Sequence, residues 1–255
     1  MVRLLLIIVL TMILATLTLL AGLADPHGKI VYRINQLWTW TILRAGAVKL
    51  KVSGLEKLDA SRPYVFMANH QSNVDIPILV QSLPRFQLRW IAKKELLWVP
   101  LFGWAIWAAK HIIVDRANPT RAVKSLRRAK GRIAAGISVV VFPEGTRSRD
   151  GQLQRFRKGA VLLAMQTNTE IVPVTILGSR DLLPSGAWRL QSGLVEVIID
   201  QPISVSGYRT GNLGLLANQV RATIAGHLRQ SASATAAAET AKSLLGERRL
   251  GRQLL

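Results

Sequence analysis

Short runs of β-branched and apolar residues alternate with helical patterns from residue 48 to residue 229, and this alternation limits the fold more than any other feature. It indicates an α/β domain, because each helix must cover a face of a sheet. We therefore predict a mostly parallel or mixed sheet flanked by helices. The expected strands are residues 48–52, 64–68, 86–92, 111–115, 138–142, 171–177 and 194–199. The expected helices are residues 76–83, 96–109, 120–135, 158–167 and 213–229.

The N-terminal segment is the second constraint, since residues 4–24 carry no charge and their only polar side chains are threonines. A bilayer-spanning helix needs about 20 apolar residues, so this segment is long enough to cross a membrane. A cleaved signal peptide with Arg3 as its basic end is the alternative, but its apolar part usually runs about 7 to 15 residues. A helix buried in a soluble protein would normally show a polar face. We therefore expect a membrane-anchoring helix ahead of the α/β domain.

Residues 30–50 combine aromatic and aliphatic side chains with three cationic ones and contain no acid. This composition fits a helix in the headgroup zone of a membrane, and it fits an amphipathic core helix equally well. The expected organisation is an anchor and interfacial helix over 1–47, a domain of catalytic size over 48–230 and a basic segment over 231–255. Because the last segment is rich in Ala and Ser, we expect a flexible tail there, with a basic surface helix as the alternative.

Composition limits the classes of function. The chain carries 34 Lys and Arg against 14 Asp and Glu, a net charge of +20, yet 49% of its residues are hydrophobic. That apolar fraction supports a folded core and excludes a mostly disordered chain. The positive charge requires an acidic partner: nucleic acid, an anionic membrane surface or a phosphorylated substrate. The absence of Cys excludes disulfides, thiolate zinc sites, iron–sulfur clusters and a cysteine nucleophile.

The first group of residues that suggests chemistry is Asn-His-Gln-Ser-Asn-Val-Asp, residues 69–75, directly after an expected strand. α/β proteins commonly build sites at such strand ends. If the loop folds back, Asp75 reaches one imidazole nitrogen of His70 and leaves the other free to accept a proton from an alcohol. The pair would then be a general base and its orienting carboxylate. Asp75 as a simple helix N-cap is the plainer alternative.

Two other chemistries fit this loop less well. A metal site needs a third ligand, and no further His or Cys lies nearby in the sequence. A serine hydrolase would place its nucleophile in a Gly-x-Ser-x-Gly turn, and the chain contains no such motif.

The second group is Phe-Pro-Glu-Gly-Thr-Arg-Ser, residues 142–148, after another apolar run. Gly145 permits a tight turn, Thr146 offers a hydroxyl, and Arg147 can hold a phosphate through two parallel hydrogen bonds. We expect Glu144 to support this anion site by orienting Arg147 or a neighbouring backbone amide. Arg116 follows a further expected strand and is a candidate for the same site. A solvated turn with a surface arginine is the alternative for this segment taken alone.

These motifs occur in the same order as the four sequence blocks of the membrane glycerolipid acyltransferases, a family that the chain resembles over roughly residues 50–205. Within this family, it is most similar to the bacterial 1-acyl-sn-glycerol-3-phosphate acyltransferases. The segments around Lys93 and Lys158 also resemble family segments, which makes both lysines candidates for supporting roles. The second block departs from the family, where residues 110–112 are usually more apolar. The blocks are Asn69-His70-x-Ser72-x-x-Asp75, Gly103 to Arg116, Phe142 to Ser148 and Val172-Pro173-Val174.

The resemblance implies an enzyme in which His70, oriented by Asp75, deprotonates the free hydroxyl of a lysophospholipid. That hydroxyl would attack the thioester of acyl-CoA or acyl carrier protein directly, without an acyl-enzyme, a metal or a bound cofactor. The expected reaction acylates the sn-2 hydroxyl of 1-acyl-glycerol 3-phosphate and forms phosphatidic acid. The alternatives are acylation of another lysolipid or of glycerol 3-phosphate and, in a different class, a membrane-anchored protein that binds anionic lipid or nucleic acid.

The implied location is a membrane, and the basic body that follows the anchor favours the cytoplasmic face of a bacterial inner membrane. The expected partners are the lysophospholipid, the acyl thioester, an anionic membrane surface and acyl carrier protein; nucleic acid is not expected. Trp98, Trp104 and Trp107 are candidates for the wall of an acyl-chain pocket, although core packing is the commoner role of such residues.

Overall fold

The computed structural model describes residues 2–115, 119–148, 150–184, 186–187 and 189–253, and these form a seven-stranded mixed sheet with helices on both faces. The strand order is β1-β7-β6-β2-β5-β3-β4. Strands β6, β2, β5, β3 and β4 are parallel, while β7 runs antiparallel to β6 and pairs in parallel with β1. The predicted α/β fold is confirmed. The strands are β1 Val48–Ser53, β2 Val65–Ala68, β3 Leu88–Lys93, β4 Ile112–Val114, β5 Ser138–Val141, β6 Ile171–Leu177 and β7 Gly193–Ile199.

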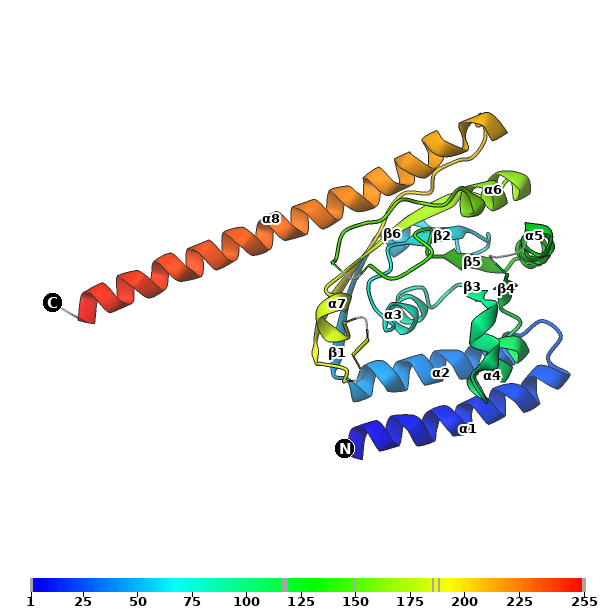
Figure 1. Cartoon of the computed structure of the whole chain (residues 1–255), viewed down its shortest axis with the longest axis horizontal. Helices are drawn as coiled ribbons and strands as arrows, with labels where there is room; N and C mark the ends of the chain where they lie inside the picture. Colours follow the sequence, from blue (N-terminus) through cyan, green and yellow to red (C-terminus); the bar gives the residue numbers. More distant parts are fainter. Residues whose placement is uncertain (1, 116–118, 149, 185, 188, 254–255) are drawn as a thin grey trace.

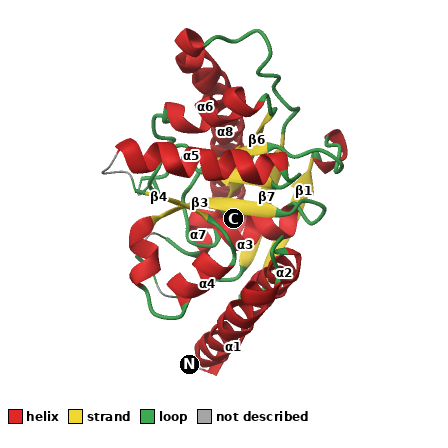
Figure 2. Cartoon of the chain, turned by 90° about the vertical axis from the view of Figure 1, so that its right-hand side faces the viewer, coloured by secondary structure: helices red, strands yellow, loops and turns green. Residues whose placement is uncertain are grey.

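The helices form layers on the two faces of the sheet (Figures 1 and 2). Helices α2 and α3 pack on one face, and α5, α6 and the first part of α8 pack on the other. The helices are α1 Val2–Ala24, α2 Lys29–Ala45, α3 Asp75–Ser82, α4 Phe102–Ala108, α5 Pro119–Ala134, α6 Lys158–Thr167, α7 Ser179–Leu182 and α8 Leu213–Gln253, with 3-10 turns η1 Leu55–Lys57, η2 Lys94–Trp98 and η3 Thr210–Asn212.

The central strands are buried on both sides, which explains why they read as continuous apolar runs. In β2, Phe66 and Ala68 join the core beneath α2 and α3, while Val65 and Met67 join the core beneath α5, α6 and α8. Successive side chains point to opposite faces of a strand, so a single short run supplies both cores. The strand ends carrying the two sequence motifs are thereby held firmly from two sides.

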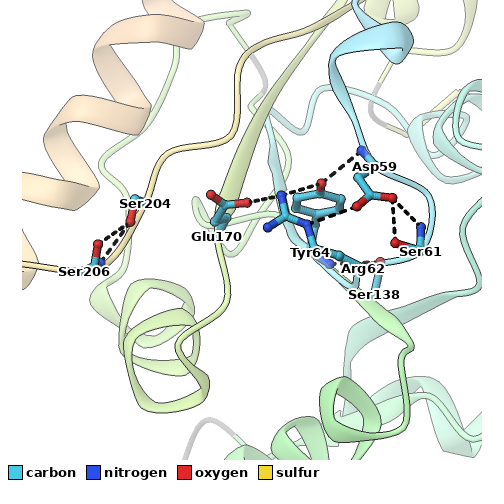
Figure 3. A network of polar contacts seen from close by, with 8 residues as sticks. All are labelled: Asp59, Ser61, Arg62, Tyr64, Ser138, Glu170, Ser204 and Ser206. Atoms are coloured by element: carbon cyan, nitrogen blue, oxygen red, sulfur yellow. Dashed lines mark hydrogen bonds and ion pairs between the residues drawn. The ribbon is translucent and has the colours of Figure 1, made fainter.

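A polar network fixes the opposite, amino end of these strands (Figure 3). The backbone N–H of Tyr64 donates to the hydroxyl of Ser138, which joins the starts of β2 and β5. Arg62 bonds the carboxylate of Glu170, the residue before β6, and the backbone N–H of Val65 donates to the carbonyl of Glu170. Because the three strands start level with one another, their carboxyl ends come to one edge.

Helix α1 lies along the body of the protein, packed against α2 and α4 (Figure 1). Gly22 of α1 approaches Ala108 of α4 so closely that a Cβ added at Gly22 would lie 2.9 Å from the Ala108 Cβ. Among the described helices, α1 alone is long and apolar enough to cross a membrane by length and composition, with a mean hydropathy of 2.5 over Ile7–Ala24. The outward side of α1 is a row of exposed aliphatic residues.

The turn between α1 and α2 is tied to the sheet. Asp25 caps α2 by accepting the backbone N–H groups of Ile30 and Val31 at 2.7 and 3.1 Å. The buried guanidinium of Arg89, on β3, donates to the carbonyls of His27 and Gly28. The N-terminal helices are therefore a fixed part of the structure.

Helix α2 packs one face against the core, as the amphipathic-core interpretation of residues 30–50 expects, and its place in a headgroup zone stays a prediction. Its inward face contributes Tyr32 and Leu43 to the core. Its outward face combines apolar and cationic side chains, as a helix at a membrane surface does. The outward residues are Ile30, Arg33, Leu37, Trp40 and Arg44.

Two segments differ from the prediction. The helix expected over 96–109 is broken into η2 and α4, because Pro100 lacks a backbone N–H and disfavours the helical conformation of the residue before it. In the segment 231–255, α8 continues as far as Gln253 and extends away from the domain, so this part is helical, as in the alternative that we gave to a flexible tail (Figure 1). The alanine content explains the difference, since Ala has the highest helix propensity.

Candidate active site

The loop between β2 and α3 places His70 beside Asp75. The distance from His70 Nδ1 to Asp75 Oδ2 is 2.8 Å, and the carboxylate is fully buried. The same oxygen accepts the backbone N–H groups of Gln71 and Ser72, each at 2.8 Å. A carboxylate only accepts, so Nδ1 carries the proton of the neutral imidazole and Nε2 is the basic nitrogen. The side chain of Asp75 bonds the loop rather than the first turn of α3, which argues against a mere helix cap.

The imidazole is also held across its ring. His70 stacks on Phe142, the residue after β5, with ring centroids 3.9 Å apart and an angle of 9° between the planes. Trp90 stacks behind Phe142, with centroids 5.8 Å apart. Hydrogen bonding at Nδ1 and stacking on the ring face together leave the imidazole little freedom to rotate. Sequence reasoning did not assign Phe142 to the site, although it is the first residue of the second motif.

Glu144 links the two loops. Its Oε1 accepts the backbone N–H of His70 at 2.8 Å, and its Oε2 accepts the backbone N–H of Gln154 at 2.9 Å. The backbone N–H of Ser148 in turn donates to the carbonyl of His70 at 2.8 Å. Burial raises the pKa of the Glu144 carboxyl, and these backbone bonds oppose the rise. Of the two roles expected for Glu144, the structure has the bond to a backbone amide.

The turn that carries the predicted anion site requires glycine. Gly145 has a φ of +78°, and its N–H donates to the carbonyl of Phe142 at 3.0 Å. Thr146, next along the chain, is exposed. Arg147 donates from Nη1 to Asn73 Oδ1 at 2.8 Å, so it reaches across to the first loop. Arg147 therefore lies beside the loop that carries His70.

The remaining predicted site residues are less closely tied to this centre. Arg116 lies outside the described residues. Lys93 is exposed at the carboxyl end of β3, on the same edge as the two loops. Lys158 begins α6, and its side chain passes beside Gly214 at the start of α8. The structure thus brings together His70, Asp75, Glu144, Gly145 and Arg147, which are the core of the prediction.

Two further polar residues support the first loop. The side-chain amide of Asn69 exchanges two hydrogen bonds with the backbone of Ile176 on β6, at 2.8 and 2.9 Å. The hydroxyl of Ser72 donates to the carbonyl of Leu183 at 2.7 Å. Both residues stand in the first motif, so their presence was visible, but their partners lie more than a hundred residues away in the sequence. Only the fold reveals those contacts.

An apolar cavity of about 300 Å³ adjoins the second loop. The three tryptophans considered for an acyl-pocket wall are not among its lining residues and are exposed, so core packing is not their role, and their place in a pocket wall stays a prediction. Among the described residues, no three His, Asp or Glu side chains come together in a way that could hold a metal. The cavity is lined from β3, β4, β5, α5 and α6 and by the second loop, through Ile91, Ile112, Val114, Ser125, Leu126, Ala129, Val141, Phe142, Pro143, Gly145, Arg157, Gly159, Ala160, Leu162 and Leu163.

Comparison with known proteins agrees with this geometry. The chloroplast 1-acyl-sn-glycerol-3-phosphate acyltransferase of Arabidopsis thaliana is 36% identical over 206 residues, 80% of this chain and 56% of that protein. The alpha form of 1-acyl-sn-glycerol-3-phosphate acyltransferase from Ovis aries is 33% identical over 175 residues, 68% of this chain and 61% of that protein. The chain thus spans little more than half the length of these curated relatives.

A solved structure matches more completely. The crystal structure of the 1-acyl-sn-glycerophosphate acyltransferase PlsC from Thermotoga maritima aligns with 90% of this chain and 96% of its own, with a TM-score of 0.71 and 27% identity. A family model described as Acyltransferase matches residues 49–177, which include both loops of the site. The chain therefore belongs to the acyltransferase family.

Proposed function

We propose that this protein transfers an acyl chain from a thioester to the sn-2 hydroxyl of 1-acyl-glycerol 3-phosphate and so forms phosphatidic acid. The observation that carries the proposal is the imidazole of His70, bonded at Nδ1 by a buried carboxylate and stacked on Phe142. This arrangement leaves Nε2 as a fixed base for an alcohol. The names of the related proteins supply the acceptor and the class of reaction.

The proposed reaction needs one proton to move twice. Nε2 of His70 takes the proton of the acceptor hydroxyl as the oxygen attacks the thioester carbonyl carbon. The tetrahedral intermediate then collapses, the carbon–sulfur bond breaks, and the thiolate takes the proton from the imidazolium. Asp75 stabilises the imidazolium between these steps through its 2.8 Å bond to Nδ1. This route uses no acyl-enzyme, and we propose no metal or bound cofactor.

Substrate binding follows from the surroundings of His70. Arg147, which lies beside the first loop, would hold the phosphate of the acceptor, with Thr146 and the backbone of Gly145 next to it. A held phosphate positions the hydroxyl, and positioning of this kind contributes up to about 7 to 11 kcal/mol in the best-oriented reactions. The apolar cavity beyond Phe142 would take acyl methylene groups, since its volume equals the lower end of the range for ligand pockets, ~300 Å³.

The proposed location is a bacterial inner membrane, with the catalytic domain on its cytoplasmic side. The apolar α1 and the outward face of α2 support contact with lipid. The net charge of +20 suits an anionic lipid surface and an acidic donor such as acyl carrier protein.

The test is an acyl-transfer assay of the purified full chain in vesicles. Lysophosphatidic acid, lysophosphatidylethanolamine, lysophosphatidylglycerol and glycerol 3-phosphate would be compared as acceptors, each with acyl-CoA and with acyl carrier protein as donors. We expect phosphatidic acid from lysophosphatidic acid to be the main product. A clear preference for an acceptor without a terminal phosphate would contradict the proposal.

A further inference from the structure

The connection from β3 to β4 exposes an apolar surface that the proposed reaction does not use. It contains η2 and α4, and none of the residues between Glu95 and Lys110 is charged. Three of the seven tryptophans of the chain lie here, with 83% of Trp98, 56% of Trp104 and 64% of Trp107 exposed. Exposed apolar patches of this kind mark an interaction surface.

We propose that Trp98, Trp104 and Trp107, here called the tryptophan face, insert into the boundary between headgroups and acyl chains of the lipid leaflet that contacts α1. Tryptophan is enriched at this boundary because its indole combines a large apolar ring with one polar N–H. The inference rests on the proposed function only in that this function places the protein on a membrane.

The packing of α4 against α1 identifies lipid as the occupant. The two helices touch at Gly22 and Ala108, where there is no room for a side chain at Gly22. The outward side of α1 exposes Leu17, Leu20 and Leu23. Helices α1, α2 and α4 lie together on one side of the molecule in both views (Figures 1 and 2). Lipid that covers the outward side of α1 therefore continues onto α4.

The charges around this surface agree with a lipid headgroup region. Lys93 is exposed just before η2, and Arg33 and Arg44 are exposed on the outward face of α2. Cationic side chains beside an aromatic and aliphatic surface are the usual composition of a protein face that meets anionic lipid. A second copy of this chain would bring the same positive charges together, which disfavours it as the occupant.

The position of the tryptophan face has a consequence for the reaction. Strand β3 is parallel to β5, and β5 is parallel to β2, so η2 begins at the edge of the sheet where His70 lies. Insertion of Trp98 would keep that edge at the level of the headgroups. A lysolipid could then reach His70 by moving within the leaflet, without leaving the membrane.

The natural chain has no Cys, so single cysteines can be labelled without background. Nitroxide labels would be attached to Trp98→Cys, Trp104→Cys and Trp107→Cys variants of the full chain in vesicles of phosphatidylethanolamine and phosphatidylglycerol. Their collision rates with oxygen, which concentrates in lipid, would be compared with those for a water-soluble nickel chelate. The matched control is Leu215→Cys on α8, which is 64% exposed like Trp107 but lies with the helices of the other sheet face.

We expect labels at the three tryptophan positions to favour oxygen and the label at Leu215 to favour the chelate. Chelate access at Trp104 and Trp107 equal to that at Leu215 would overturn the proposal, and so would spin–spin broadening that shows these labels buried against a second copy. The measurement needs no turnover, so its failure is distinct from a failed acyl-transfer assay.

A second measurement uses tryptophan itself and does not depend on the labels. Lipids brominated near the headgroup should quench the tryptophan emission of the unaltered chain. Joint substitution Trp98→Gln, Trp104→Gln and Trp107→Gln should remove a large part of that quenching, whereas Leu215→Gln should not. Equal quenching of the triple variant and the unaltered chain would contradict insertion.

Discussion

Replacing Asp75 by Asn removes one charge from the candidate site while keeping the shape of the side chain. One carboxylate oxygen, Oδ2, accepts three hydrogen bonds, from His70 Nδ1 and from the backbone of Gln71 and Ser72. All three donors need an acceptor, so the amide oxygen of the new Asn must take this place. The imidazole then keeps its proton on Nδ1, and the variant tests the charge of Asp75 separately from its orienting role.

The magnitude follows from that geometry. A hydrogen bond to a charged group is worth about 1.5–3 kcal/mol and a neutral one about 0.5–1.5 kcal/mol, so the imidazolium loses roughly 1.5 kcal/mol, or about tenfold in rate. Burial weakens solvent screening and extends the expected loss in kcat to about 10²-fold. The amide nitrogen replaces Oδ1, which is buried without a hydrogen-bond partner among the described residues, and this costs about 1–3 kcal/mol in the free energy of unfolding.

The assay is phosphatidic acid formation from lysophosphatidic acid in vesicles, with thermal unfolding measured in parallel. Asp75→Ala, which also removes the orientation of His70, should lose about 10²- to 10⁴-fold in kcat and thus more than Asp75→Asn. Wild-type kcat in a folded Asp75→Asn variant would refute the role of the charge. Equal losses of kcat in Asp75→Asn and Asp75→Ala would refute the inference that the Asn variant keeps the imidazole proton on Nδ1.

Three further predictions concern the second loop. Arg147→Ala should raise KM for lysophosphatidic acid about 10- to 100-fold, as expected for a lost charge-assisted pair, and should leave KM for an unphosphorylated acceptor unchanged in the same assay. Because burial raises the pKa of Glu144 above its ordinary 4.5, the folded protein holds this proton more tightly than the unfolded chain. Its contribution to the free energy of unfolding should therefore fall as the pH rises from 4.5, and denaturant titrations of Glu144→Gln should lack that fall. Gly145→Ala should cost about 1–2 kcal/mol in the same titrations, since only glycine adopts a φ of +78° without strain; an unchanged midpoint would contradict this.

The sheet was predictable because its strands are unusually clear in the sequence. β2 is apolar at every position and β5 at every position after Ser138, which is typical of central strands buried on both faces, and each expected strand is present within a few residues. The order of the strands and the antiparallel β7 were not predictable, since pairing depends on contacts distant in sequence. The break before α4 was visible as Pro100, but the long apolar pattern around it favoured one helix.

The site was predictable where a motif is local. His70 and Asp75 are five residues apart, and their contact follows from a loop that folds back on itself. Contacts between motifs were not accessible, such as Glu144 with the backbone of His70, or Phe142 stacked on its ring. The exposure of Trp104 could not be predicted either, because the apolar pattern of a helix is the same whether protein or lipid covers it.

The most direct test of the account compares two histidine variants of the full chain. His70→Ala removes the proposed base, and His27→Ala alters an exposed histidine in the turn between α1 and α2. Both would be reconstituted in the same vesicles, and the rate of phosphatidic acid formation from lysophosphatidic acid and acyl-CoA would be measured by mass spectrometry. We predict a loss of about 10²- to 10⁴-fold for His70→Ala and nearly full activity for His27→Ala. A folded His70→Ala variant as active as the unaltered chain would contradict it.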